Sequence, residues 1–396
     1  MEKFNLPRKW RFIYNHHWFM MPMRIDWSRR LGMALMKASL LCGAHYAGAT
    51  AHRPGILPSS CDPHVAQESF ARWLGYAAMA DELGFDWISV SEHHYSPLIL
   101  VPSVGPIAGA LTQIVRRARI ALLGPLVSIN NPVRVAEEIA MLDQLSRGRL
   151  LVLLLRGTPS EFKAYEPVDP SLTQEKTQAA TRLVRKALME TAPFAWRDEF
   201  FDFPNIAIWP RPLQQPLPPM YFSGNSLNSA EFAARERLGL CISFHRPEAV
   251  ADIVARYRAE ARRCGWEPAP DQIVYRGFGL VADTDARAAE LEAVFLPPHQ
   301  RFLLDGPAPG PSANGSKESE EVERSRLADA TPFGMGRMLF AGNPDTVVER
   351  LRVFRSLTGA GVVDLVFSSA QIPADDERRS IELFAREVLP QIHSFG

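Results

Sequence analysis

Two adjacent histidines follow a short apolar segment, in the order Glu92-His93-His94. A neutral imidazole titrates near neutral pH and can both take up and release a proton. Neighbouring residues of an extended segment point to opposite sides, so we expect His93 and His94 to face different surroundings. The pair is therefore poorly suited to share one metal ion, and no third ligand is evident. Two interpretations stay open: a catalytic histidine, or two hydrogen-bonded structural histidines.

A second set of residues could bind an anion. Arg156 directly follows six consecutive apolar residues, where a charge is costly unless it meets an anion. That anion is either a phosphate or a nearby carboxylate such as Glu161. The run Ser-Gly-Asn-Ser-Leu-Asn-Ser at 223–229 is typical of a helix start, where hydroxyls and backbone N–H groups can cradle a phosphate. The same residue types are also ordinary helix caps, so the phosphate interpretation depends on the run converging with Arg156.

The alternation of short apolar runs with helical patterns predicts a parallel sheet covered by helices. We predict eight strands: Lys37–Cys42, Trp87–Val90, Arg119–Leu123, Leu150–Leu155, Met220–Phe222, Leu240–Phe244, Ile273–Val281 and Val363–Phe367. This α/β pattern favours a single (β/α)₈ TIM barrel with inserted loops. An open doubly wound sheet is the alternative, but the first strand is not followed by G-x-G-x-x-G. Because barrel strands end at one mouth, His93, Arg156, the 223–229 run, His45 and Tyr46 should meet there.

Composition excludes several partner classes. Lys plus Arg and Asp plus Glu both total 44 of the 396 residues, so the net charge is zero and gives no field that attracts nucleic acid or an anionic membrane. No segment approaches the roughly 20 apolar residues needed to span a bilayer. The four cysteines have no C-x-x-C or zinc-ligand spacing, which fits reduced thiols in a cytoplasmic protein.

The chain is predicted to form one domain with two additions. Residues 1–35 are expected to form an N-terminal extension outside the barrel, which then occupies 36–396. A segment at about 297–335 is poor in apolar residues and rich in Pro, Gly, Ser and Glu, which predicts a flexible insertion. Its place after the seventh strand suggests a lid over the mouth.

These residues, in this order, resemble the bacterial luciferase-like monooxygenase family. The similarity runs from about residue 36 to the C-terminus. It is carried by Gly84-Phe85-Asp86, Glu92-His93-His94, the segments 131–138 and 142–149, Arg156-Gly157, Ser226, the segment 231–234 and Gly342-Asn343-Pro344. The resemblance implies reduced FMN at the barrel mouth, which reacts with O₂ to give a peroxyflavin. It places the catalytic histidine on His93 and a supporting one on His94.

The resemblance also implies the cofactor contacts. The phosphate arginine of the family falls on Arg156, and its phosphate-binding turn falls on Asn225, Ser226 and Ser229, although luciferase has Glu at the first of these. Many members have a non-proline cis peptide after the third strand, which alignment places between Leu123 and Gly124. Such a bond costs roughly 3 kcal/mol and would curve the backbone beneath the flavin ring.

The expected function is a flavin-dependent monooxygenase that acts on a small, hydrophobic organic substrate. The loop with His45 and Tyr46 would belong to the substrate pocket, although its apolar residues suit surface packing or a dimer interface equally well. A homodimer follows from the resemblance. A separate NAD(P)H:flavin reductase follows because the chain has no nicotinamide fingerprint. Two alternatives keep the fold: hydride transfer with a deazaflavin, and a non-catalytic flavin-binding partner subunit.

Overall fold

The computed structural model describes residues 36–47, 58–94, 99–162, 169–304, 339–368 and 371–395. The expected N-terminal extension at 1–35 lies outside these residues, as does most of the expected insertion at 297–335. One boundary changes. Helix α9 (Asp285–Leu304) runs through the first residues of that segment, so an insertion would begin after the helix.

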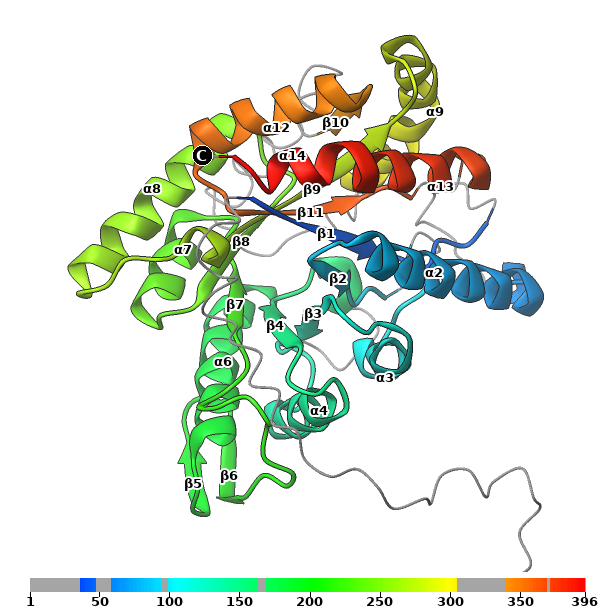
Figure 1. The fold of residues 1–396 in the computed structure, drawn as a ribbon. Coiled ribbons are helices and arrows are strands. Elements are labelled where there is room, and N and C mark those ends of the chain that lie inside the picture. The colour runs from blue at the N-terminus through cyan, green and yellow to red at the C-terminus, as the bar shows by residue number, and fades with distance from the viewer. Residues whose placement is uncertain are drawn as a thin grey trace, which may run out of the picture.

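Eight parallel strands close into a barrel, as the sequence predicts (Figure 1). They are β1 (Lys37–Cys42), β2 (Trp87–Val90), β3 (Arg119–Leu126), β4 (Leu150–Leu155), β7 (Met220–Ser223), β8 (Gly239–Ser243), β9 (Ile273–Val281) and β11 (Val362–Val366). Each strand pairs with its successor in this order, and β11 also pairs with β1. The closing strand therefore comes from the opposite end of the chain.

Helices surround the barrel (Figure 1). The long ones are α2 (Pro63–Leu83), α3 (Val104–Ile114), α4 (Pro132–Leu145), α6 (Thr173–Met189), α7 (Leu227–Arg235), α8 (Pro247–Arg263), α9, α12 (Pro344–Thr358) and α13 (Ala374–Leu383). A π-helical segment η5 (Phe384–Val388) and α14 (Leu389–Ile392) follow α13. Short turns are η2 (Pro58–Ser60), α5 (Pro159–Phe162), η3 (Pro170–Leu172) and η4 (Pro270–Gln272).

The starts of α2 and α4 are encoded by a capping side chain followed by proline. Asp62 accepts a hydrogen bond from the His64 N–H before Pro63 opens α2, and Asn131 does the same for Val133 before Pro132 opens α4. Proline fits this position because its missing N–H would have no partner inside the helix. These caps fix where each helix leaves the barrel rim.

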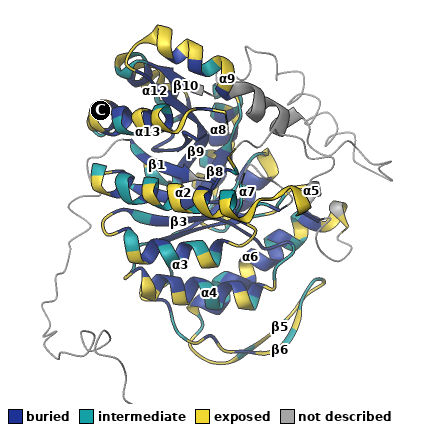
Figure 2. Ribbon diagram, turned by 90° about the vertical axis from the view of Figure 1, so that its right-hand side faces the viewer, coloured by how far each residue is buried: buried dark blue, intermediate teal, exposed yellow. Residues whose placement is uncertain are grey.

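The core has two layers, one inside the barrel and one between the barrel and its helices. In β4, Leu151 and Leu153 point into the barrel, whereas Leu150, Val152 and Leu154 pack beneath the helices. Both faces are thus buried, which explains the uninterrupted apolar run. Figure 2 shows buried strands at the centre and exposed outer faces on the helices.

The structure adds elements that the sequence analysis did not predict. The aromatic, proline-rich stretch after α6 contains an antiparallel hairpin of β5 (Phe194–Arg197) and β6 (Asp202–Ile206). Both figures show it extending beyond α4 and α6. A further strand, β10 (Leu339–Gly342), pairs with the last residues of β9.

Candidate active site

His93 lies on the loop that leaves the C-terminal end of β2. Its Nδ1 is 2.7 Å from Oε1 of Glu161, and its Nε2 is 3.3 Å from Oγ of Ser91. The side chain of His93 is 17% exposed, whereas that of Glu161 is 1% exposed. Hydrogen-bonding groups at both ring nitrogens therefore fix the imidazole, while part of the ring stays open.

Glu161 is the carboxylate that orients His93. Burial raises the pKa of Glu161, but hydrogen bonds from His93 and from the Thr158 backbone N–H outweigh that effect and hold the pKa below its usual value. The Thr158 N–H lies 2.6 Å from Oε2. Gly157 makes the turn possible, because its φ of 86° is left-handed and an added Cβ would lie 3.2 Å from this carboxylate. Sequence reasoning named Glu161 only as a possible partner of Arg156.

The contacts of Ser91, His93 and Glu161 have the connectivity of a nucleophile, base and carboxylate. Ser91 is only 1% exposed, however, so a substrate carbonyl cannot reach its hydroxyl in this arrangement. The group is better suited to moving a proton through His93 than to forming a covalent ester.

A buried ion pair lies beneath this group, inside the barrel. Nε of Arg276 on β9 is 3.0 Å from Oδ2 of Asp364 on β11, and Oγ of Ser89 donates to Oδ1 at 2.6 Å. Nη1 of Arg276 is 3.5 Å from Oγ of Ser91, so the ion pair touches the residue that contacts His93.

His94 lies in a different group. Its Nε2 is 3.2 Å from Oε1 of Glu92, which also accepts from the Asn130 side chain at 3.1 Å. Both His94 and Glu92 are buried. The two histidines thus have separate partners, as expected for neighbours in an extended segment, and the contacts of His94 favour a supporting role.

Arg156 directly follows β4, so it lies at the same end of the barrel as His93, which follows the parallel strand β2. The Arg156 side chain is exposed, and its backbone carbonyl accepts a hydrogen bond from the Ser128 hydroxyl. Its guanidinium thus places a positive charge at this rim.

The 223–229 run forms the start of α7, as predicted. Ser226 is the N-cap: its Oγ accepts from the Ser229 N–H at 3.2 Å and lies 3.0 Å from the Ser229 hydroxyl. Gln174 also donates to the Ser229 hydroxyl, which is buried. The side-chain oxygen of Asn225 accepts from the Ser243 N–H at 2.8 Å, which ties the end of β7 to β8. Ser226 and the Asn225 amide N–H₂ are the groups of this run best placed to meet a phosphate.

The prediction of a cis peptide bond between Leu123 and Gly124 is wrong. In the described residues the cis bonds precede Pro210 and Pro216. The strand instead turns through Gly124, which has a φ of 121°, and the pairing of β3 with β4 shifts register between Leu123 and Leu126. A Cβ on Gly124 would lie 2.5 Å from Cδ1 of Leu155, so glycine is required for both backbone and packing reasons.

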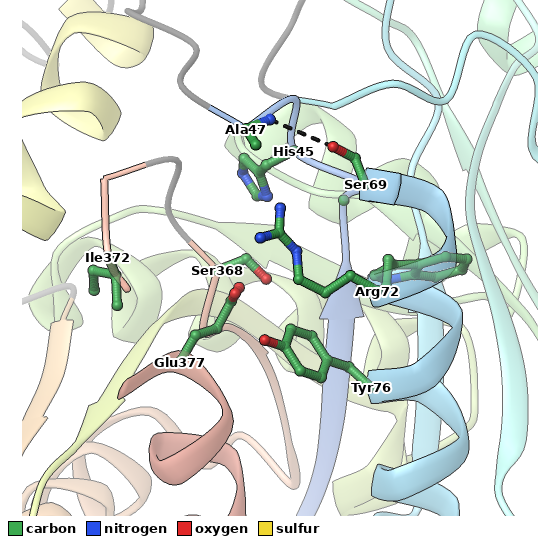
Figure 3. Close-up of a pocket in the computed structure, with 10 residues that line it drawn as sticks. His45, Ala47, Ser69, Arg72, Tyr76, Ser368, Ile372 and Glu377 are labelled. Carbon is green, nitrogen blue, oxygen red and sulfur yellow. Dashed lines mark hydrogen bonds between the residues drawn. The ribbon is translucent and has the colours of Figure 1, made fainter. Parts of the chain in front are cut away.

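His45 lines a pocket between α2 and α13, at the ends of β1 and β11 (Figure 3). Burial, together with the charge of Arg72 and despite a backbone hydrogen bond at Gly43, lowers the pKa of His45 to about 4. Tyr46 does not line this pocket; its hydroxyl accepts from the Asp62 N–H at 3.0 Å. Arg72, Tyr76 and Glu377 were not predicted from the sequence, because helical spacing alone does not show that they meet at one pocket.

Among the residues that the structure describes, no cluster of three or more His, Cys, Asp or Glu side chains could hold a metal ion. Over the same residues, no helix is both long enough and apolar enough to cross a membrane.

The family model of luciferase-like monooxygenases matches residues 55–361. An alkanal monooxygenase beta chain of Photorhabdus luminescens is 26% identical over 261 residues, which cover 65% of this chain and 78% of the relative. The uncharacterized protein y4wF of Sinorhizobium fredii is 32% identical over 173 residues, covering 44% of this chain and 50% of that protein. The chain thus matches only about half the length of this second relative.

Solved structures with this fold include both flavin and deazaflavin enzymes. Monooxygenase RslO1 from Streptomyces bottropensis superposes with a TM-score of 0.70 at 24% identity, over 90% of this chain and 99% of that one. The oxygenating constituent of 3,6-diketocamphane monooxygenase from Pseudomonas putida, in complex with FMN, also superposes with a TM-score of 0.70. It is 18% identical, and the match covers 90% of this chain and 98% of that one. An F420-dependent secondary alcohol dehydrogenase superposes with a TM-score of 0.66 at 17% identity, over 90% of this chain and 99% of that one.

Proposed function

Because the chain belongs to the luciferase-like monooxygenase family, we propose that it is a flavin-dependent monooxygenase that oxidises a small, largely apolar organic molecule with reduced FMN and O₂. The observation that carries this proposal is the arrangement of His93, held between Glu161 and Ser91, at the same barrel end as Arg156 and the start of α7. In this proposal, His93 transfers a proton and Arg156 binds an anion together with the start of α7, all at the same end of the barrel.

The side chains present fit a flavin phosphate. Arg156 offers a guanidinium, and α7 offers backbone N–H groups, its dipole and the Ser226 hydroxyl. When bound, the reduced flavin supplies the electrons that activate O₂. Arg156, Asn225, Ser226 and Ser229 would hold its phosphate, and the backbone turn at Gly124 would lie beneath its ring.

His93 would hold and move the proton that the reaction needs. Glu161 is an acceptor for the Nδ1–H, which leaves Nε2, beside the Ser91 hydroxyl, as the ring nitrogen that would gain or lose the proton. His94, bonded to Glu92, would shape the pocket wall. A separate NAD(P)H:flavin reductase would deliver the reduced flavin, and two copies of the chain would form a homodimer.

The phosphate contact can be tested with two flavins that differ only in that group. We expect FMN, but not riboflavin, to lose about tenfold to a hundredfold in affinity when Arg156 is replaced, the size of one or two hydrogen bonds to a charged group. The variant is Arg156→Met, and Arg262→Met on the exposed end of α8 is the matched control. Equal losses for both flavins would contradict the phosphate assignment.

The cofactor class is tested by thermal unfolding with FMN and with the deazaflavin F420 in parallel. FMN should raise the melting temperature more. Stabilisation by F420 alone would instead support hydride transfer, the alternative in keeping with the F420-dependent fold relative.

Catalysis by this chain is tested with His93→Ala. We expect FMN binding to persist while oxidation is lost. Turnover equal to that of the native chain would remove His93 from the reaction. FMN binding without turnover by the native chain would favour a non-catalytic partner subunit, a role in keeping with relatives named as beta chains.

A further inference from the structure

The pocket around His45 has a polar lining that the proposed chemistry at His93 does not use. Its walls come from the ends of β1 and β11 and from α2 and α13. Figure 3 shows Arg72 and Tyr76 pointing from α2 towards His45, Ser368 and Glu377. Side chains from four separate elements thus converge on one small space.

Two hydrogen-bond donors in this pocket lack a partner among the described residues. Nε1 of Trp73 is buried without an acceptor, and the Trp73 side chain is 3% exposed and lines the pocket. The guanidinium of Arg72 forms no hydrogen bond or ion pair with a described residue. The Trp73 donor is buried, and an unsatisfied buried donor costs about 1–3 kcal/mol, so it favours a ligand that supplies an acceptor oxygen. Arg72 is an exposed residue that lines the same pocket, so it adds a positive charge beside that donor without such a penalty.

The one carboxyl group in the pocket is already engaged. Glu377 is 6% exposed and accepts hydrogen bonds from Ser368 and Tyr76. Burial raises the pKa of Glu377 despite these bonds and the nearby charge of Arg72. The side chain of Glu377 is thus held by Ser368 and Tyr76 rather than by an ion pair with Arg72 among the described residues, so the guanidinium can meet an outside anion.

The apolar part of the lining suits an organic ligand rather than a bare ion. The lining also includes apolar groups: the ring of Trp73, Ile372 and the small residues Gly43 and Ala47. A planar carboxylate matches the guanidinium in shape and charge, and the indole N–H can donate to the same group.

We propose that this pocket binds the carboxylate of an apolar organic acid, with Arg72 and the Trp73 indole N–H as the donors. Since the pocket lies at the same barrel end as His93, the acid is the substrate class of the proposed monooxygenase. That last step rests on the proposed function, whereas binding of the acid does not.

The test uses benzoate and its neutral, equally shaped amide, benzamide, with the flavin-free protein and isothermal titration. We expect benzoate to bind at one site and benzamide at least about tenfold more weakly, the loss of one charge-assisted contact. Arg72→Met should weaken benzoate about tenfold to a hundredfold and leave benzamide unchanged. Arg262→Met is the matched control and should change neither.

Trp73→Phe separates a binding role from a structural one, because it removes the N–H and keeps an aromatic ring. Benzoate binding should weaken by roughly threefold to tenfold, while the melting temperature of the free protein stays equal or rises, since an unpartnered buried donor is gone. A fall in melting temperature with unchanged affinity would overturn the role of the indole.

The proposal as a whole fails if the native chain does not bind benzoate, or if Arg72→Met binds it as tightly. These titrations contain no flavin, so they test the carboxylate site separately. If the chain bound benzoate but neither FMN nor F420, the proposed function would be refuted and the carboxylate site would stand. FMN binding without benzoate binding would refute the carboxylate site alone.

Discussion

Replacing Glu161 with glutamine tests whether this carboxylate orients His93. The carboxylate accepts from His93 at 2.7 Å and from the Thr158 N–H at 2.6 Å. Glutamine keeps one oxygen, so its amide N–H₂ must face one of the two donors. One charge-assisted bond is then lost inside the protein, where Glu161 is 1% exposed.

The expected loss in the free energy of unfolding is about 1.5–3 kcal/mol, the range for a hydrogen bond to a charged group. For a chain of this length that is roughly 2–4 °C in melting temperature. Turnover should fall about tenfold to a hundredfold, because a base that loses its orienting partner loses part of its catalytic effect. FMN affinity should not change.

The pH dependence gives a second reading. The pKa of Glu161 is lower in the folded chain than in the unfolded one. Its contribution is therefore complete above the unfolded pKa and is lost as pH falls through the folded pKa. Thermal unfolding of both proteins should show a gap at pH 7 that closes on acidification.

The matched control is Glu138→Gln on α4, where the exposed pair with Arg134 contributes less than about 0.5 kcal/mol. Equal melting temperatures for the native chain and Glu161→Gln at pH 7, or a gap that widens in acid, would refute the reasoning.

Three further predictions follow from buried groups. The pKa of His45 is about 4 in the folded chain and 6.5 in the unfolded chain. Protonation of His45 in the unfolded chain should therefore cost up to about 3 kcal/mol of stability as pH falls from 6.5 to 4. In urea unfolding, His45→Gln should reduce this dependence of stability on pH. Asp81 accepts from three consecutive backbone N–H groups, those of residues 116–118, so Asp81→Ala should cost about 3 kcal/mol and Asp81→Asn less; equal denaturation midpoints would contradict this. Gly124→Ala should cost about 2–4 kcal/mol, and adding Leu155→Ala should restore only the part due to the clash, because the φ of 121° stays strained; full restoration would show that the backbone carries no cost.

The barrel could be predicted because its signal is local. Each strand is a short apolar run, and both faces of β4 are apolar as the two-layered core requires. The strand β10 was not predicted, because it has only four residues and follows a segment that breaks the alternation of strands and helices. The β5–β6 hairpin was not predicted, because the prolines and aromatic residues around it obscure the two-residue period of apolar residues that marks a strand.

The sequence predicted that His93 and Arg156 would lie at one end of the barrel, but it did not predict their contacts. His93 and Arg156 fall at strand ends, which the barrel brings to one rim. Glu161 reaches His93 through the turn at Gly157 and the four-residue helix α5. Sequence periodicity does not predict the course of such a short, irregular segment. Resemblance misled at Leu123–Gly124, where a glycine with positive φ and a shifted register produce the bend.

The pairing of β1 with β11 affects how the molecule is made. Until residues 362–366 leave the ribosome, β1 has hydrogen-bonding groups on one side that only the final strand can satisfy. The growing protein therefore carries an open sheet edge through almost its whole synthesis, a hazard for association with other chains. Folding factors that protect nascent polypeptides should matter for its yield, and fragments that stop before Val362 should aggregate rather than accumulate as smaller stable forms.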